Sequence, residues 1–239
     1  MILLFLGTST TSASLFVGAY FIPLYFQFAR DDSAIMAAVR LLPFISVTIS
    51  FVMLNGALMP VLGYYMPWYV VSGVFLTIGG SLMYTVDSQT SPAKIYGYSV
   101  ILAVGAGSAL QASYSIASAK VRPHEIPAAI GFINVAQIGS IVVALTISGA
   151  LFQNFAFRYL KHALAGKAIP IEEIRGAVAG TQSFVFQQGS LEVKEAAVKA
   201  IIQAMDKVYA LVIAEGALQL VSSLFMKRGK LFMKAVARG

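Results

Sequence analysis

Residues 127–152 read PAAIGFINVAQIGSIVVALTISGALF, a run without a single charged side chain. A helix rises about 1.5 Å per residue, so a run of this length crosses the roughly 30 Å hydrocarbon core of a bilayer. Only helices and closed barrels satisfy backbone hydrogen bonds there, and the run lacks the polar–apolar alternation of a barrel strand. The stretch therefore predicts a transmembrane helix.

Similar apolar runs recur along the chain, separated by charged or turn-forming residues. The predicted spans are 8–29, 41–62, 68–86, 95–118, 127–152 and 207–226. Arg30, Asp31 and Asp32 end the first run, and Pro92 cannot continue a helix from the connector before it. The sequence predicts an all-α integral membrane protein, a bundle of six transmembrane helices with five of them in residues 1–152.

The composition agrees with a membrane protein. Of 239 residues, 58% are hydrophobic and 11% are charged, against about 25% charged in soluble domains. The net charge of +7 is concentrated outside the apolar runs, so it indicates connections near lipid headgroups and not a nucleic-acid partner. The absence of cysteine excludes a disulfide scaffold and a thiolate metal site.

Lysine and arginine in the short connections favour one orientation. One side of the membrane would hold Lys120, Arg122, Lys227, Arg228, Lys230, Lys234 and Arg238. The other would hold only Arg30, Arg40 and Lys94. Because positive charge accumulates on the cytoplasmic side, we expect 227–239 to be a basic cytoplasmic tail and 153–206 a long non-cytoplasmic loop.

The long loop contains two amphipathic helical patterns. The longer begins at Ser190, a residue that can cap a helix, and continues to Lys207. The shorter begins at Pro170. The apolar residues of the longer pattern recur every four positions, which favours a helix on the membrane surface leading into the last span. A lid or recognition element is the alternative.

The spans lack the residues of an intramembrane catalyst. Both histidines, His124 and His162, occur in connections, and no span holds a serine–histidine pair or two carboxylates. We therefore expect no enzyme activity, no metal and no cofactor.

The fourth span carries a stripe of small residues that favours close packing between helices. Its members are Gly105, Ala109, Ser113 and Ala117.

Uncharged polar residues form rows on three spans. They are Tyr20 and Gln27 on the first span, Gln111 and Ser115 on the fourth, and Asn134 and Gln137 on the fifth. Such groups are costly when turned toward lipid, so they should face other helices or a watered cavity. Hydrogen bonds between helices and a path for a solute are both consistent with the rows.

Glu215 is the single carboxylate deep in a span. An ionised acid at that depth costs roughly 2.5–3.5 kcal/mol, so it needs protonation or a partner. A protonated carboxyl bonded to a neighbouring helix is favoured over a role in proton coupling.

Several segments resemble the fungal drug:proton antiporters of the major facilitator superfamily, in particular the fourteen-span branch. The segments are YFIPLYFQ at 20–27, VRLLP at 39–43, GYYMP at 63–67, LMYTVD at 82–87 and QIGS at 137–140. The resemblance covers nearly the whole chain and corresponds to the C-terminal half of such a transporter. The chain also starts directly in an apolar run, without a basic leader.

The resemblance implies proton-coupled efflux of small organic compounds such as toxins or drugs, in the plasma or vacuolar membrane. The partners would be the bilayer, the substrate, the proton and an N-terminal half that carries the antiporter signature. The first, second, fourth and fifth spans would line the cavity, which makes Glu215 structural. The alternative is a truncated, non-transporting membrane protein that packs with or regulates a partner half. The substrate stays open.

Overall fold

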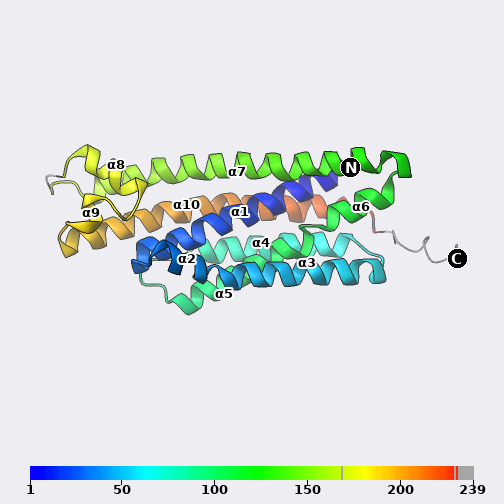
Figure 1. Ribbon diagram of the computed structural model, residues 1–239, viewed down its shortest axis with the longest axis horizontal. Helices are drawn as coiled ribbons and strands as arrows, with labels where there is room; N and C mark the ends of the chain where they lie inside the picture. Colours follow the sequence, from blue (N-terminus) through cyan, green and yellow to red (C-terminus); the bar gives the residue numbers. More distant parts are fainter. Residues whose placement is uncertain (168, 229, 231–239) are drawn as a thin grey trace.

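The computed structural model describes residues 1–167, 169–228 and 230, and within them every regular element is helical. The helices are α1 (Ile2–Arg30), α2 (Ala34–Arg40), α3 (Leu42–Leu62), α4 (Met66–Tyr84), α5 (Pro92–Ala109), α6 (Ala112–Lys120), the 3-10 turn η1 (Pro123–Glu125), α7 (Ile126–Ala163), α8 (Ile171–Ala179), α9 (Phe184–Gln187) and α10 (Leu191–Leu224). The long helices lie along one axis, and α8 and α9 sit at one end (Figure 1).

The structure confirms the all-α membrane fold. Five segments in the described residues are long and apolar enough to cross a bilayer: α1, α2 with α3, α4, α5 with α6, and α7. The sixth expected span, 207–226, falls mostly within α10, which is not among these five. Polar residues such as Glu215 and Gln219 interrupt its apolar surface, and Gln219 is fully buried inside the bundle.

Glycines bring α10 and α4 into close contact. A Cβ added at Gly73 of α4 would lie 2.6 Å from the backbone nitrogen of Leu220, and one at Gly216 of α10 would lie 2.6 Å from that of Thr77. Side chains larger than hydrogen cannot fit at either position without moving backbone. The third expected span and the last therefore pack tightly along each other.

The small stripe of the fourth expected span is buried along its whole length. Gly105, Ala109, Ser113 and Ala117 are all buried. A Cβ at Gly105 would meet the Leu76 nitrogen at 2.7 Å, and Ser113 shares a hydrogen bond of 2.5 Å with the Tyr69 hydroxyl. Gly105 and Ser113 therefore face α4, as close helix packing requires.

The expected continuous helix over 95–118 is interrupted. Helix α5 ends at Ala109 and α6 begins at Ala112, with Leu110 and Gln111 in a turn between them. The spacing of apolar residues predicts which face of a helix is buried. It does not predict a two-residue break after which the chain continues in the same direction.

The region 153–206 differs from a long loop. Helix α7 continues to Ala163, and residues from Leu191 onward already belong to α10. As predicted, the Ser190 hydroxyl caps α10, accepting a hydrogen bond from the Val193 nitrogen at 3.4 Å, and α8 begins directly after Pro170.

The expected surface helix is instead the start of α10, continuous with the last expected span. Its apolar residues Val193, Ala197 and Ile201 are buried in a core with Leu160 of α7 and Ile174 of α8. The prediction of a helix on the membrane surface is wrong because α7, α8 and α9 offer this apolar face a protein partner. The expected basic tail lies largely outside the described residues, which include only 227, 228 and 230 of it.

Candidate functional site

Asn134 and Gln137 lie one turn apart on α7, and both contact Tyr114 of α6. The Tyr114 hydroxyl lies 2.6 Å from Asn134 Oδ1 and 2.5 Å from Gln137 Oε1. A hydroxyl has one proton, so it donates to one amide oxygen at a time, and the other amide can turn its NH₂ group toward the same oxygen. The three side chains therefore form a polar junction between two helices.

Gln111 and Ser115 extend this junction along α6. Both are exposed; Ser115 directly follows Tyr114, and Gln111 occupies the break before α6, where its carbonyl accepts from the Tyr114 nitrogen at 3.3 Å. We use the name α6–α7 polar face for Gln111, Tyr114, Ser115, Asn134 and Gln137.

The α6–α7 polar face is open in this chain and surrounded by apolar side chains. Asn134 is exposed and Gln137 half-buried, while Phe132, Val135 and Ile138 of α7 are exposed beside them. Neutral donors and acceptors within an aromatic and aliphatic surface can bind uncharged parts of organic molecules. They do not provide a nucleophile or a metal ligand set, and no metal-binding cluster occurs in the described part of the chain.

Tyr20 and Gln27 lie away from this face. Helices α1 and α7 run in parallel, with the rings of Phe21 and Phe152 5.6 Å apart between centroids. At about 1.5 Å per residue, roughly 27 Å of helix axis separates Asn134 from Phe152. The structure therefore does not bring all six predicted cavity residues into one site.

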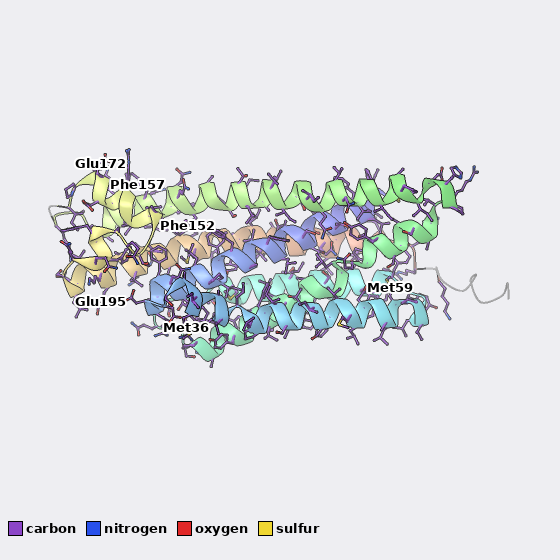
Figure 2. The ribbon with its side chains drawn as sticks, in the orientation of Figure 1. Met36, Met59, Phe152, Phe157, Glu172 and Glu195 are labelled. Carbon is purple, nitrogen blue, oxygen red and sulfur yellow. The ribbon has the colours of Figure 1, made fainter. Side chains whose placement is uncertain are left out.

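Tyr20 and Gln27 each line a separate cavity at the α8–α9 end of the bundle. Tyr20 lines a cavity of about 620 Å³ together with Phe152, Phe157 and Arg175. Figure 2 shows Phe152 and Phe157 beside α8 at this end of the bundle. Gln27 lines another cavity of about 400 Å³. Tyr20 and Gln27 thus lie on one helix, as the sequence predicted. In the structure they are far along the helix axis from the polar residues of α6 and α7.

Two hydrogen bonds connect α1 and α10. The Ser14 hydroxyl donates to Glu215 Oε2 at 2.7 Å, and the Thr10 hydroxyl donates to Gln219 Oε1 at 2.7 Å. The pairs are one turn apart on antiparallel helices, so they form a ladder. Gln219 is fully buried and its Nε2 has no hydrogen-bond partner among the described residues.

Sequence reasoning missed Tyr114, Ser14 and Thr10. Tyr114 belongs neither to the predicted stripe of small residues, which includes Ser113, nor to the predicted polar row, which includes Ser115. Ser14 and Thr10 belong to the run TSTTSAS at 8–14, whose four-residue spacing matches that of Glu215 and Gln219. That match was the available signal for the ladder.

Charged residues gather where α10 leaves the central bundle. Burial raises the pKa of Asp206 from 3.8 to about 7; Lys207 opposes this rise and Asp87 adds to it. Lys207 donates a hydrogen bond of 2.6 Å to the Tyr84 hydroxyl. Asp206 directly precedes the last expected span, so a neutral carboxyl there suits the boundary of an apolar environment.

Comparison with known proteins gives consistent relatives. The chain is 42% identical over 226 residues to the efflux pump patC of Aspergillus clavatus, and 43% identical over 237 residues to the MFS-type transporter pgmG of Aspergillus terreus. It is 33% identical to the MFS-type transporter of the phomenoic acid biosynthesis cluster of Leptosphaeria maculans.

These matches cover 95%, 97% and 98% of this chain, respectively. The chain spans about 40% of the length of these curated relatives. No protein-family model matches it. The expected resemblance to fungal transporters of the major facilitator superfamily is confirmed.

Proposed function

We propose that this chain, a homologue of the fungal MFS-type transporters, forms the C-terminal half of a transporter that exports small organic compounds in exchange for protons. The names of its relatives, efflux pumps among them, support this proposal. The observation that carries it is the open α6–α7 polar face, in which Tyr114 lies between Asn134 and Gln137.

In this proposal the α6–α7 polar face meets the substrate in a cavity completed by the N-terminal half. The junction can exchange partners, because the Tyr114 hydroxyl can donate to either amide or to a substrate oxygen. The helix break at Leu110 and Gln111 places an irregular backbone beside this face, as in transporters whose discontinuous helices line a binding site. Rocking of the two halves would then expose the cavity to each side in turn.

The protein is an integral membrane protein by its helices and its relatives. We place it in the plasma or vacuolar membrane, with the C-terminus in the cytoplasm. Substrate, proton and the N-terminal half are its proposed partners.

The experiment completes the chain with the N-terminal half of a relative and measures export of a panel of compounds from yeast. The variants are Gln111→Ala, Gln137→Ala and Tyr114→Phe. Thr146→Ala is the matched control: Thr146 is an exposed polar residue of α7, and within the described residues its hydroxyl donates only to its own helix, at Val142 O.

A hydrogen bond contributes about 0.5–1.5 kcal/mol, so each site variant should change export of some compounds by roughly 2- to 12-fold. Protein levels should stay constant, and the control should leave the pattern unchanged. An unaltered pattern in all three site variants would contradict the proposed site. Absence of export from a well-expressed, unsubstituted chimera would favour the non-transporting alternative.

A further inference from the structure

A groove lies outside the apolar bundle, between the end of α7 and the start of α10. Its volume is about 850 Å³, within the usual range for small-molecule sites. Alanines 163, 165, 196 and 200 and Tyr159 give it an apolar floor. Its rim carries the basic side chains Arg158, Lys161 and Lys199, together with His162.

None of the residues lining this groove is acidic. Two other basic residues at the same end are paired: Lys167 with Glu192 at 2.7 Å and Arg175 with Glu172 at 3.7 Å. Within the described residues, Arg158, Lys161 and Lys199 form no salt bridge. The groove is therefore a site of uncompensated positive charge.

The acids nearest in sequence belong to a neighbouring groove. Glu195, one turn before Lys199, lines that second groove with Glu192 and Asp206. Lys199 lines both grooves, whereas Arg158 and Lys161 line only the basic one. Figure 2 shows Glu195 at the α9 end of the bundle, where α10 begins. Arg158 and Lys161 are therefore the residues that distinguish the basic groove.

The position of the groove along α7 corresponds to a membrane interface. Residues 126–157 carry no charge, and Arg158 is the first charged residue of the helix after them. Long basic side chains at this boundary reach toward lipid headgroups while their stems stay on apolar surface. The groove thus combines cations at headgroup depth with an apolar floor beneath them.

We propose that this groove binds the phosphate of an anionic phospholipid in the adjoining leaflet. Arg158, Lys161 and Lys199 bind the phosphate, and the alanine and tyrosine floor accommodates the glycerol and the upper acyl chain. Each lysine or arginine close to an anionic headgroup contributes about 1 kcal/mol, or roughly fivefold in affinity. In the predicted topology the adjoining leaflet is the non-cytoplasmic one. The inference is independent of the transport proposal, because it concerns lipid binding by the chain itself.

The test uses the purified full chain in neutral detergent and native mass spectrometry. Phosphatidylglycerol and phosphatidylcholine with identical acyl chains are titrated separately. We expect phosphatidylglycerol to bind more tightly, and Arg158→Gln with Lys161→Gln to weaken it about 25-fold. Equal affinity for the two lipids would overturn the proposal.

Two further variants separate the groove from general charge and from misfolding. Lys94→Gln with Arg175→Gln removes the same charge from exposed positions at the same end, and it should leave affinity within twofold. Arg158→Lys with Lys161→Arg should retain the phosphatidylglycerol preference. An equal loss in the Lys94/Arg175 variant would overturn the proposal, provided that circular dichroism shows unchanged helix content.

Inorganic phosphate distinguishes the source of the anion. Millimolar phosphate should not displace the lipid, because it lacks contacts with the apolar floor. Full displacement by phosphate alone would mean that the groove is a site for a soluble anion, and the lipid assignment would be wrong.

Discussion

Ser14 and Glu215 face each other across the interface of α1 and α10, and the serine hydroxyl donates to the carboxyl at 2.7 Å. One turn away, Thr10 and Gln219 repeat the arrangement at the same distance. The ladder gives Glu215 Oε2 and Gln219 Oε1 a hydrogen-bond donor each, which lowers the cost of these oxygens in an apolar environment. It supports a structural role for Glu215 in joining two helices.

Glu215→Gln should keep this ladder, because glutamine retains an oxygen that accepts from Ser14. We expect thermal stability in detergent within about 0.5 kcal/mol of the unsubstituted protein, since changes that preserve the local contacts have small effects. Glu215→Leu leaves the Ser14 hydroxyl without its acceptor and should cost about 1–3 kcal/mol. In the chimeric transporter, loss of proton-driven export in Glu215→Gln at normal protein levels would instead identify a coupling residue.

Gly73→Ala should destabilise the contact between α4 and α10. The added methyl group would lie 2.6 Å from the Leu220 nitrogen, and overpacking of this kind costs about 1–3 kcal/mol. Gly139→Ala on α7 is the matched control, because a Cβ there meets nothing within 4 Å. The control should be neutral or stabilising by up to about 1 kcal/mol, since alanine favours helix. Equal unfolding temperatures for the two variants would contradict the close packing.

Asp206→Asn should remove a pH dependence of stability. The pKa of Asp206 rises from 3.8 to about 7 on burial, so the folded chain binds more protons than the unfolded chain between these values. The contribution of this group therefore stabilises the fold at low pH and is lost as pH rises toward 7. Unfolding temperatures at pH 5 and pH 8 measure the effect: the gain of the variant over the unsubstituted protein should be larger at pH 8 than at pH 5. Gln203→Ala, at an exposed residue of the same helix that does not titrate, should leave the pH dependence unchanged.

The predicted topology places the two ends of the last expected span on opposite sides of the membrane. A reporter fused after Gly239 should be cytoplasmic, and one inserted within residues 165–185 should be on the other side. Activity of both reporters in the same compartment would refute this orientation.

Cysteine labelling should distinguish the open face from the packed interior. The chain has no cysteine, so a single introduced thiol gives a clear signal. Ser115→Cys and Asn134→Cys, both at exposed positions, should react with a water-soluble maleimide, whereas Ala103→Cys, at a fully buried position, should not. In the chimera, an exported compound should slow the first two reactions. Unreactive thiols at both positions in the chimera would indicate contacts between helices in place of a cavity.

The sequence predicted those features of the fold that depend on local pattern. Charge-free runs located five spans, the small stripe around Gly105 predicted a buried face, and Ser190 predicted the start of α10. In each case a few neighbouring residues determine the structure, through burial or through a cap.

Features that depend on how helices rotate and where they end were not predictable in this way. The junction at Tyr114 depends on where α6 contacts α7 along the length of α7. The separation of Tyr20 from this junction depends on how far Tyr20 lies along α1 from the level of α6. The partner of Glu215 was equally hidden, because nothing local to α10 specifies which helix faces it. The surface-helix prediction for the start of α10 failed for the same reason: an amphipathic pattern does not say whether protein or lipid covers its apolar face.

Helix α10 is a single rod of 34 residues, roughly 51 Å at about 1.5 Å per residue. One end of α10 packs beside α8 and α9. The other end packs closely against α4 at Gly73 and Gly216. A continuous helix transmits displacement along its length without a hinge. Any tilt of α4 within the membrane would therefore be passed along α10 to the opposite end of the bundle, where Ala197 and Ile201 pack with Leu160 of α7.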